Sequence, residues 1–146
     1  MKIAATSGCF DLIHAGHVYM FKDMRSLVAP DGLVVVFVNN DDYLLRTKGR
    51  VITPLEQRLQ ILTALENVDI AIPFKDDTPY SLIEIVQPKY WVKGSEYLAK
   101  NIPETQIVKS YGGELCFSIG GPDVHTTDIL GQIYLKMSSG VISNDL

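Results

Sequence analysis

The chain has 146 residues, a formal net charge of −4 and 47% apolar residues. This length is typical of a single domain. Such a domain buries about two-thirds of the surface that the unfolded chain exposes, so its core needs no disulfide or metal for stability. The negative charge argues against a protein that coats nucleic acid, because such proteins carry a basic stripe, whereas a small phosphate ligand needs only a local group of cations.

The cysteines and the first residues bear on the compartment. Cys9 and Cys116 are far apart and in no CxxC pattern, which argues against a zinc site or a disulfide framework and favours free thiols in a reducing cytoplasm. Residues 1–5 lead directly into a strand-like segment and lack the apolar stretch of a signal peptide. The longest apolar run, residues 33–38, is too short to cross a membrane. We expect a cytoplasmic protein whose partners are neither membrane nor nucleic acid.

The first part of the chain predicts a strand, a helix and a second strand. Residues 2–6 form a short apolar strand, and residues 7–16 form a polar loop that contains glycine. Apolar residues at helical spacing follow over residues 18–28, up to a turn at 30–32. The unbroken apolar run 33–38 is typical of a parallel strand that is covered on both faces.

The next segment predicts a polar stop, a basic loop and a second helix. Residues 39–42 are polar and end the strand, and residues 46–51 are expected to form the basic loop. Thr53 is the expected N-cap, with Pro54 at the first helical position and leucines continuing the helix as far as Leu65.

The remaining chain continues the alternation. The expected elements are a strand at 70–73, a helix from 77 to 86, a strand at 90–92, a helix at 103–110, a strand at 114–119 and a helix at 126–137. The polar tail, 138–146, is expected to be flexible. Strands that alternate with helices predict a single Rossmann-like α/β domain over residues 1–146, with a parallel sheet of about five strands and helices on both faces.

Ligands of such sheets bind beyond the carboxyl ends of the strands, at the point where the strand order switches. The most distinctive polar segments of the chain are expected at that edge. They are residues 7–17, 39–50, 93–97 and 120–127.

The segment from Gly8 to His17, GCFDLIHAGH, carries the strongest functional signal. Gly8 lets the backbone pass closely beneath a ligand, and Gly16 does the same before the first helix. The amino terminus of that helix offers free N–H groups to phosphate. His14 and His17 are three residues apart at this junction, where both imidazoles can donate hydrogen bonds to phosphate oxygens.

This segment resembles the GxFDxxHxGH motif of the cytidylyltransferase-like nucleotidyltransferase superfamily. The resemblance extends over nearly the full chain and is strongest to the heptose 1-phosphate adenylyltransferase branch. The other stretches that carry it are residues 48–50, 54–58, 67–69, 76–79 and 92–97.

The resemblance implies roles for the loop residues. His14 and His17 would contact the triphosphate and stabilise the transition state. Cys9 and Phe10 would hold the nucleotide through their backbone; many relatives have threonine in place of Cys9, so any hydroxyl contact is lost. Asp11 would order the loop.

The resemblance also places cations over the phosphates. Lys48 is expected to take part in catalysis. Arg46 would lie beside it on the basic loop. Arg58 would reach back to the substrate or the triphosphate, with a surface ion pair as the alternative, and Asp41 is a second candidate for binding the substrate.

The resemblance also implies nucleotide contacts just after the expected strand at 90–92. Gly94 and Glu96 would border the base or the ribose. Lys93 would contact a phosphate, or else lie at the surface as a strand-end charge.

The final helix resembles the family less closely. Relatives carry a serine-threonine-threonine stretch at its start, where hydroxyl and N–H groups bind phosphate. His125 replaces the serine, and the arginine often found upstream is absent from residues 120–123. Thr126 and Thr127 remain suited to phosphate, or to plain N-capping.

The implied reaction is a direct in-line attack of an acceptor phosphate on the α-phosphorus of an NTP. Catalysis then consists mostly of positioning and charge neutralisation. Mg²⁺ is expected to arrive on the nucleotide, since the sequence has no evident carboxylate cluster for it. The expected partners are an NTP, with ATP favoured, and a sugar phosphate, in a protein that resembles homodimeric relatives.

Two other hypotheses about the function stay open. One is a CTP-dependent cytidylyltransferase for glycerol 3-phosphate or another polyol phosphate. The other is a nucleotide-binding module without catalysis, against which the intact histidine pair argues. A Rossmann dehydrogenase is disfavoured because no GxGxxG follows the first strand. The base and the acceptor are not fixed by the sequence.

Overall fold

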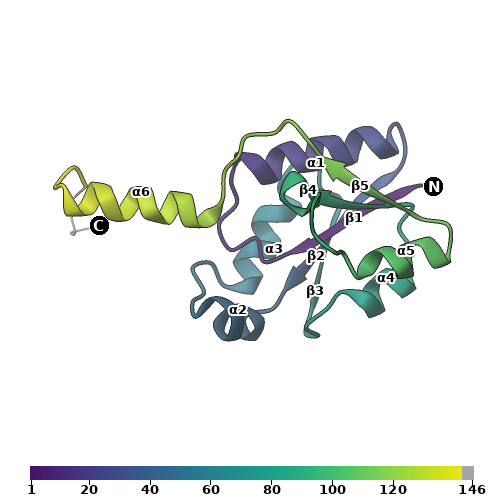
Figure 1. Ribbon diagram of the computed structural model, residues 1–146, viewed down its shortest axis with the longest axis horizontal. Coiled ribbons are helices and arrows are strands. Elements are labelled where there is room, and N and C mark those ends of the chain that lie inside the picture. Colours follow the sequence, from purple (N-terminus) through teal and green to yellow (C-terminus); the bar gives the residue numbers. More distant parts are fainter. Residues whose placement is uncertain (143–146) are drawn as a thin grey trace.

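The computed structural model describes residues 1–142, in which five parallel strands form one sheet in the order β3-β2-β1-β4-β5 (Figure 1). The strands are β1 (Ile3–Gly8), β2 (Leu33–Asn39), β3 (Ile70–Phe74), β4 (Tyr90–Gly94) and β5 (Glu114–Ser118). The helices are α1 (Ala15–Val28), α2 (Asp41–Lys48), α3 (Leu55–Thr63), α4 (Tyr80–Val86), α5 (Glu104–Ser110) and α6 (Thr126–Ser138), with a 3₁₀ turn η1 (Ser95–Tyr97). The predicted α/β fold with a five-stranded parallel sheet is confirmed.

Both faces of the sheet are buried, because successive strand residues point to opposite sides. Ala4 and Val36 pack in a cluster with α1 and α3. Ala5 and Phe37 pack in a second cluster with α4 and α5. The apolar run of β2 is therefore buried on both faces, as expected for a central parallel strand.

The sheet opens between its two middle strands at their carboxyl ends. β1 and β4 are paired at Ala4–Tyr90 and Ala5–Trp91, although both strands continue for three residues further. Beyond that point the hydroxyl of Thr6 donates to the carbonyl of Val92 at 2.7 Å. The strand order also switches here, since β2 and β3 lie on one side of β1 and β5 lies beyond β4. This opening is where ligands of such folds bind.

The segment after β2 differs from the prediction. Residues 41–48 form helix α2, where the sequence suggested a polar stop and a basic loop. The side chain of Asn40 caps the helix by accepting from the N–H of Tyr43 at 2.9 Å. Gly49 ends it in the left-handed conformation with φ +72°, which glycine adopts without steric cost. The next helix begins at Leu55 with Pro54 as N-cap, so the predicted cap at Thr53 is wrong.

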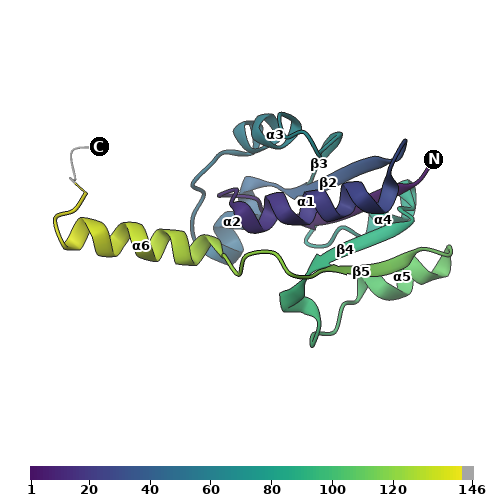
Figure 2. The same ribbon diagram turned by 90° about the horizontal axis from the view of Figure 1, so that it is seen from above.

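Helix α6 extends away from the sheet and from the other helices (Figures 1 and 2). It has no buried residue. The predicted flexible tail begins at its last residue, and residues 143–146 lie outside the described part of the chain. Within residues 1–142, no helix has the length and apolar character needed to cross a membrane.

Candidate active site

The loop after β1 is anchored by a buried aromatic side chain in an unusual conformation. Phe10 has φ +50°, a left-handed value that is uncommon for a non-glycine residue, and its side chain is buried. Its ring lies 5.0 Å from that of His17 and 5.8 Å from that of Phe21. A Cβ at Gly8 would lie only 3.0 Å from the Phe10 ring. The packing of Phe10 thus holds the loop and requires glycine at position 8.

The two histidines of the loop stack on each other with 3.8 Å between ring centroids. His14 Nδ1 accepts from the N–H of Gly16 at 3.2 Å, and His17 Nδ1 accepts from the N–H of His14 at 3.3 Å. An imidazole that accepts at Nδ1 carries its proton on Nε2 when it is neutral. Both rings therefore have Nε2–H as their free donor, at the amino terminus of α1.

Burial keeps this pair neutral. Desolvation lowers the pKa of His17 to about 4, helped by the nearby imidazoles of His14 and His125. Desolvation also lowers the pKa of His14. A triphosphate would reverse this effect, because negative charge close to an imidazole favours its protonated form.

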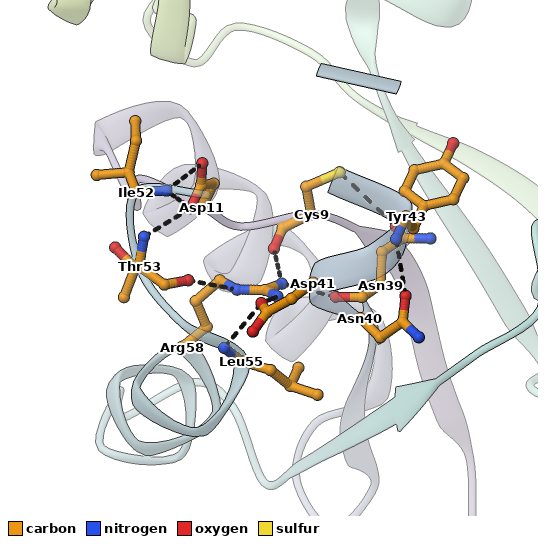
Figure 3. Close-up of polar contacts among 10 residues, drawn as sticks. All are labelled: Cys9, Asp11, Asn39, Asn40, Asp41, Tyr43, Ile52, Thr53, Leu55 and Arg58. Carbon is orange, nitrogen blue, oxygen red and sulfur yellow. Dashed lines mark hydrogen bonds and ion pairs between the residues drawn. The ribbon is translucent and has the colours of Figure 1, made fainter. Parts of the chain in front are cut away.

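Arg58 joins the ends of β1 and β2 to the start of α3 (Figure 3). Its guanidinium donates to the carbonyls of Cys9 at 2.6 Å, Asn39 at 2.7 Å and Thr53 at 2.8 Å. It also pairs with Asp41 at 2.7 Å, and its own side chain is fully buried.

The expectation that Arg58 contacts the substrate is therefore corrected, whereas that for Asp41, whose side chain is 40% exposed, stays a prediction. The donors of Arg58 are directed at protein oxygens, and Asp41 accepts from Arg58 and from the N–H of Leu55 at 3.0 Å. The alternative of a surface ion pair also fails for Arg58, since its side chain has no exposed area. Both residues position the backbone beneath the site.

Asp11 makes a second connection between the loop and the segment before α3. Its carboxylate accepts from the N–H of Ile52 at 2.9 Å and of Thr53 at 2.8 Å (Figure 3). The residue is 8% exposed, so these two bonds satisfy a nearly buried charge. Asp11 orders the loop by joining it to residues more than forty positions away.

Three cavities lie in series along the carboxyl edge of the sheet. The central cavity shares His14 and His17 with one neighbour and Cys9 and Lys48 with the other. The central cavity is lined by Cys9, Phe10, Asp11, His14, His17, Leu44, Lys48, Arg50, His125, Thr126 and Thr127. The β5-side cavity includes Gly16, Gly94, Glu96, Ser118 and Pro122, and the β2-side cavity includes Gly8, Asn39, Tyr43, Lys93, Tyr97 and Glu104.

The structure separates residues that the sequence grouped together. Lys93 was grouped with Gly94 and Glu96 but lines the opposite cavity, because neighbouring strand residues point in opposite directions. Arg46 lines none of the three cavities. It belongs to α2 and pairs with Asp77 at 2.7 Å, with both side chains largely exposed.

The sequence reasoning missed Arg50 as a site residue. Arg50 lines the central cavity, and its buried Nε has no hydrogen-bond partner among the described residues. Its position two residues after Lys48 is a signal that the sequence offered.

Residues 120–125 form a strap that closes one side of the site. The carbonyl of Val124 would lie 3.4 Å from a Cβ at Gly16, so the strap passes close over the start of α1. Thr126 donates its hydroxyl to the carbonyl of Leu12 at 3.4 Å. His125 Nε2 lies 3.1 Å from the carboxylate of Asp123. The amino terminus of α6 thereby contacts the loop of residues 8–17, here called the histidine loop.

These features give the α/β domain an edge, where its sheet divides, that is suited to a phosphate-bearing ligand. The neutral histidine pair and the amino termini of α1 and α6 all lie at that edge.

Comparison with known proteins specifies the class. The cytidylyltransferase-like family model matches residues 5–129, and the chain belongs to that family. It is 42% identical to the bifunctional protein HldE of Alcanivorax borkumensis over 92% of the chain, and 46% identical to that of Hahella chejuensis over 78%. The matches cover 28% and 24% of those proteins, so the chain spans about a quarter of their length. Membership of the family makes the chain a nucleotidyltransferase.

Solved structures agree on the fold. A lipopolysaccharide core biosynthesis protein from Thermoplasma volcanium superposes with a TM-score of 0.67 at 24% identity, over 84% of this chain and 99% of that one. A pantoate-beta-alanine ligase from Francisella tularensis superposes with a TM-score of 0.51 at 18% identity, over 99% of this chain and 72% of the ligase.

Proposed function

We propose that the domain transfers AMP from ATP to a heptose 1-phosphate or a closely related sugar phosphate and releases pyrophosphate. The similarity to HldE supports this acceptor and this nucleotide. The observation that carries the reaction is the stacked pair His14 and His17, which keep Nε2–H as a free donor and line the central cavity.

The proposed chemistry is a single displacement on the nucleotide, which enters as its magnesium complex. An oxygen of the acceptor phosphate forms a bond to the α-phosphorus, and the bond from that phosphorus to the bridging oxygen of the β-phosphate breaks. Pyrophosphate leaves with the electron pair. Magnesium bound to the phosphates neutralises part of their charge.

Residues of the central cavity are assigned to the phosphates. The imidazoles of His14 and His17 donate to oxygens on which charge develops, in a partly desolvated place where such bonds are strong. Lys48 and Arg50 line the same cavity and supply positive charge. Thr126 and Thr127 present hydroxyl and N–H groups at the start of α6, where an anion is favoured.

We further propose that the domain is a cytoplasmic homodimer in which a second copy covers α6. The cysteines are free, which suits a reducing compartment. The side chains of Ile133, Tyr134 and Leu135 are 41%, 71% and 59% exposed, and a helix of this length is marginal in water without packing. Sedimentation velocity of the wild type and of Tyr134→Glu tests the proposal: a dimer and a monomer are expected, and a monomeric wild type would contradict it.

The proposed reaction is tested by pyrophosphate release with Mg²⁺. ATP, CTP, GTP and UTP are each paired with heptose 1-phosphate, mannose 1-phosphate and glycerol 3-phosphate. We expect the highest rate with ATP and the heptose phosphate, and a loss of about a hundredfold or more in His17→Ala. A CTP-dependent rate with glycerol 3-phosphate would favour the cytidylyltransferase alternative. Nucleotide binding without release would indicate a non-catalytic module.

A further inference from the structure

We propose that the β2-side cavity is the acceptor site, in which Lys93 binds the acceptor phosphate and Glu104 selects acceptors by their hydroxyl groups. This inference rests on the proposed function and adds to it the place and the recognition of the second substrate.

The environment of Lys93 indicates an anion-binding role. The residue is 7% exposed at the end of β4, and its ammonium belongs to the wall of the β2-side cavity. Among the described residues, its hydrogen bond to the hydroxyl of Ser7 is long, at 3.4 Å, and its ion pair with Glu104 is loose, at 3.9 Å. An ammonium has three donors, and a buried charge favours closer partners than these. A phosphate dianion satisfies such a group better than either present contact does.

Two aromatic rings fix the position of the ammonium. Nζ of Lys93 lies 5.2 Å from the ring centroid of Trp91 and 5.1 Å from that of Tyr97. These cation–π contacts hold the long side chain in place without using its N–H donors. Lys93 is therefore held beside the β1 loop with donors available to a ligand.

Glu104 is a second charge in this cavity that is largely shielded from solvent. Its side chain is 13% exposed at the first position of α5. When a phosphate takes over the ammonium of Lys93, the carboxylate needs hydrogen-bond donors of its own, and the hydroxyl groups of a sugar supply them. The same carboxylate repels a second anionic group, which disfavours bisphosphates.

The cavity has the size and the lining for a sugar phosphate. Its volume is about 370 Å³, within the range of small-molecule sites. Its walls include the polar side chains of Asn39, Tyr43 and Asn101. It meets the central cavity at Cys9 and Lys48, so a phosphate bound at Lys93 lies on the side from which it can approach the nucleotide.

The test measures the KM for each substrate separately in Lys93→Met, Glu104→Gln and the control Lys100→Met. Lys100 is a matched control because its Nζ lies 4.9 Å from the same Tyr97 ring, yet it is exposed and lies outside the β2-side cavity. We expect Lys93→Met to raise the KM for heptose 1-phosphate by about tenfold or more, with the KM for MgATP unchanged. Lys93→Arg should retain most of the acceptor affinity, and Lys100→Met should match the wild type.

Glu104→Gln tests the selection of acceptors and is nearly isosteric, so folding should be preserved. We expect a higher KM for heptose 1-phosphate, together with stronger inhibition by glucose 1,6-bisphosphate than in the wild type. A rise in the KM for MgATP in Lys93→Met would overturn the inference, because Lys93 would then serve the nucleotide. Unchanged acceptor kinetics in both variants would also overturn it.

Failure of the inference can be told from failure of the proposed reaction. If the wild type releases no pyrophosphate, thermal shift with heptose 1-phosphate alone still tests the cavity. Stabilisation of the wild type that is absent in Lys93→Met would support the acceptor site, and equal shifts or none in either protein would overturn it.

Discussion

The two rims of the site are built in different ways. The β1–β2 rim, made of Cys9, Asn39, Asp41, Thr53 and Arg58, is joined by a buried guanidinium that donates to protein oxygens on three segments. The β5–α6 rim, residues 120–127, contains the pair of His125 and Asp123, whose side chains are 49% and 95% exposed. The first rim fixes the backbone beside the central cavity, whereas the second can change its residues at little cost to the fold.

The difference fits the places where the resemblance to the family is strong and weak. The histidine loop, residues 8–17, resembles the family motif and begins on the buried rim. The two departures that the resemblance implies, His125 in place of a serine and no arginine at residues 120–123, fall on the exposed rim. Substitutions in exposed positions rarely change the free energy of unfolding by much. The residues at such positions can therefore differ between proteins that bind different ligands.

The largest effect is expected from breaking the buried rim with Arg58→Met. The carbonyls of Cys9, Asn39 and Thr53 would lose their buried donor, and Asp41 would lose its ion-pair partner and keep only the N–H of Leu55. We expect the free energy of unfolding to fall by about 3–5 kcal/mol, measured by urea denaturation. Arg46→Met is the matched control, since its pair with Asp77 is also 2.7 Å long but exposed, and should cost less than about 1 kcal/mol. Equal losses would contradict the comparison.

The next effect is a dependence of stability on pH. Because the pKa of His17 is lowered from 6.5 to about 4 in the folded protein, the unfolded chain binds more protons between these values. The free energy of unfolding should therefore fall by about 3 kcal/mol as the pH drops from 6.5 to 4, through this residue alone. His17→Asn should show a shallower slope in that window. Parallel curves for the two proteins would mean that burial does not depress this pKa.

A smaller loss is expected from Asp11→Ala, which breaks the connection between the loop and residues 52–53. Two N–H groups would lose their acceptor, at a cost of about 2 kcal/mol in the free energy of unfolding. The rate of pyrophosphate release should also fall, because the loop carries both histidines. Full activity with reduced stability would show that the loop is ordered without Asp11.

The smallest change in stability is expected on the exposed rim, from His125→Ser, which introduces the serine that the family resemblance implies at this position. The free energy of unfolding should stay within about 0.5 kcal/mol of the wild type. Pyrophosphate release should persist with a changed KM for the nucleotide, since position 125 lines the central cavity. A large loss of stability would contradict the assignment of this rim as tolerant.

The sequence predicted the fold well because the fold depends on local periodicity. All five strands and five of the six helices follow from apolar runs and helical spacing. Helix α2 was missed because its polar and basic residues were interpreted as a strand stop and a loop, although its caps Asn40 and Gly49, the acidic residues of its first turn and the basic residues of its last turn are all helix signals.

The site was predicted where it depends on a contiguous motif and missed where it depends on distant backbone. His14, His17 and Lys48 do reach one cavity with Thr126 and Thr127. The burial of Arg58 could not be foreseen, because its partners are carbonyl groups up to 49 positions away that no residue type announces. Glu104 likewise comes to Lys93 only through the packing of α5.

The projection of α6 gives one wall of the site a thermal behaviour of its own. Thr126 and Thr127 belong to a helix without a single buried residue, whereas the histidines belong to the packed sheet. Segments with few buried contacts open at lower free energy than a core does. On warming, a copy whose α6 has lost its dimer partner should therefore release the phosphates of the nucleotide while its strands are still intact, so that activity falls at a lower temperature than the one at which the sheet melts.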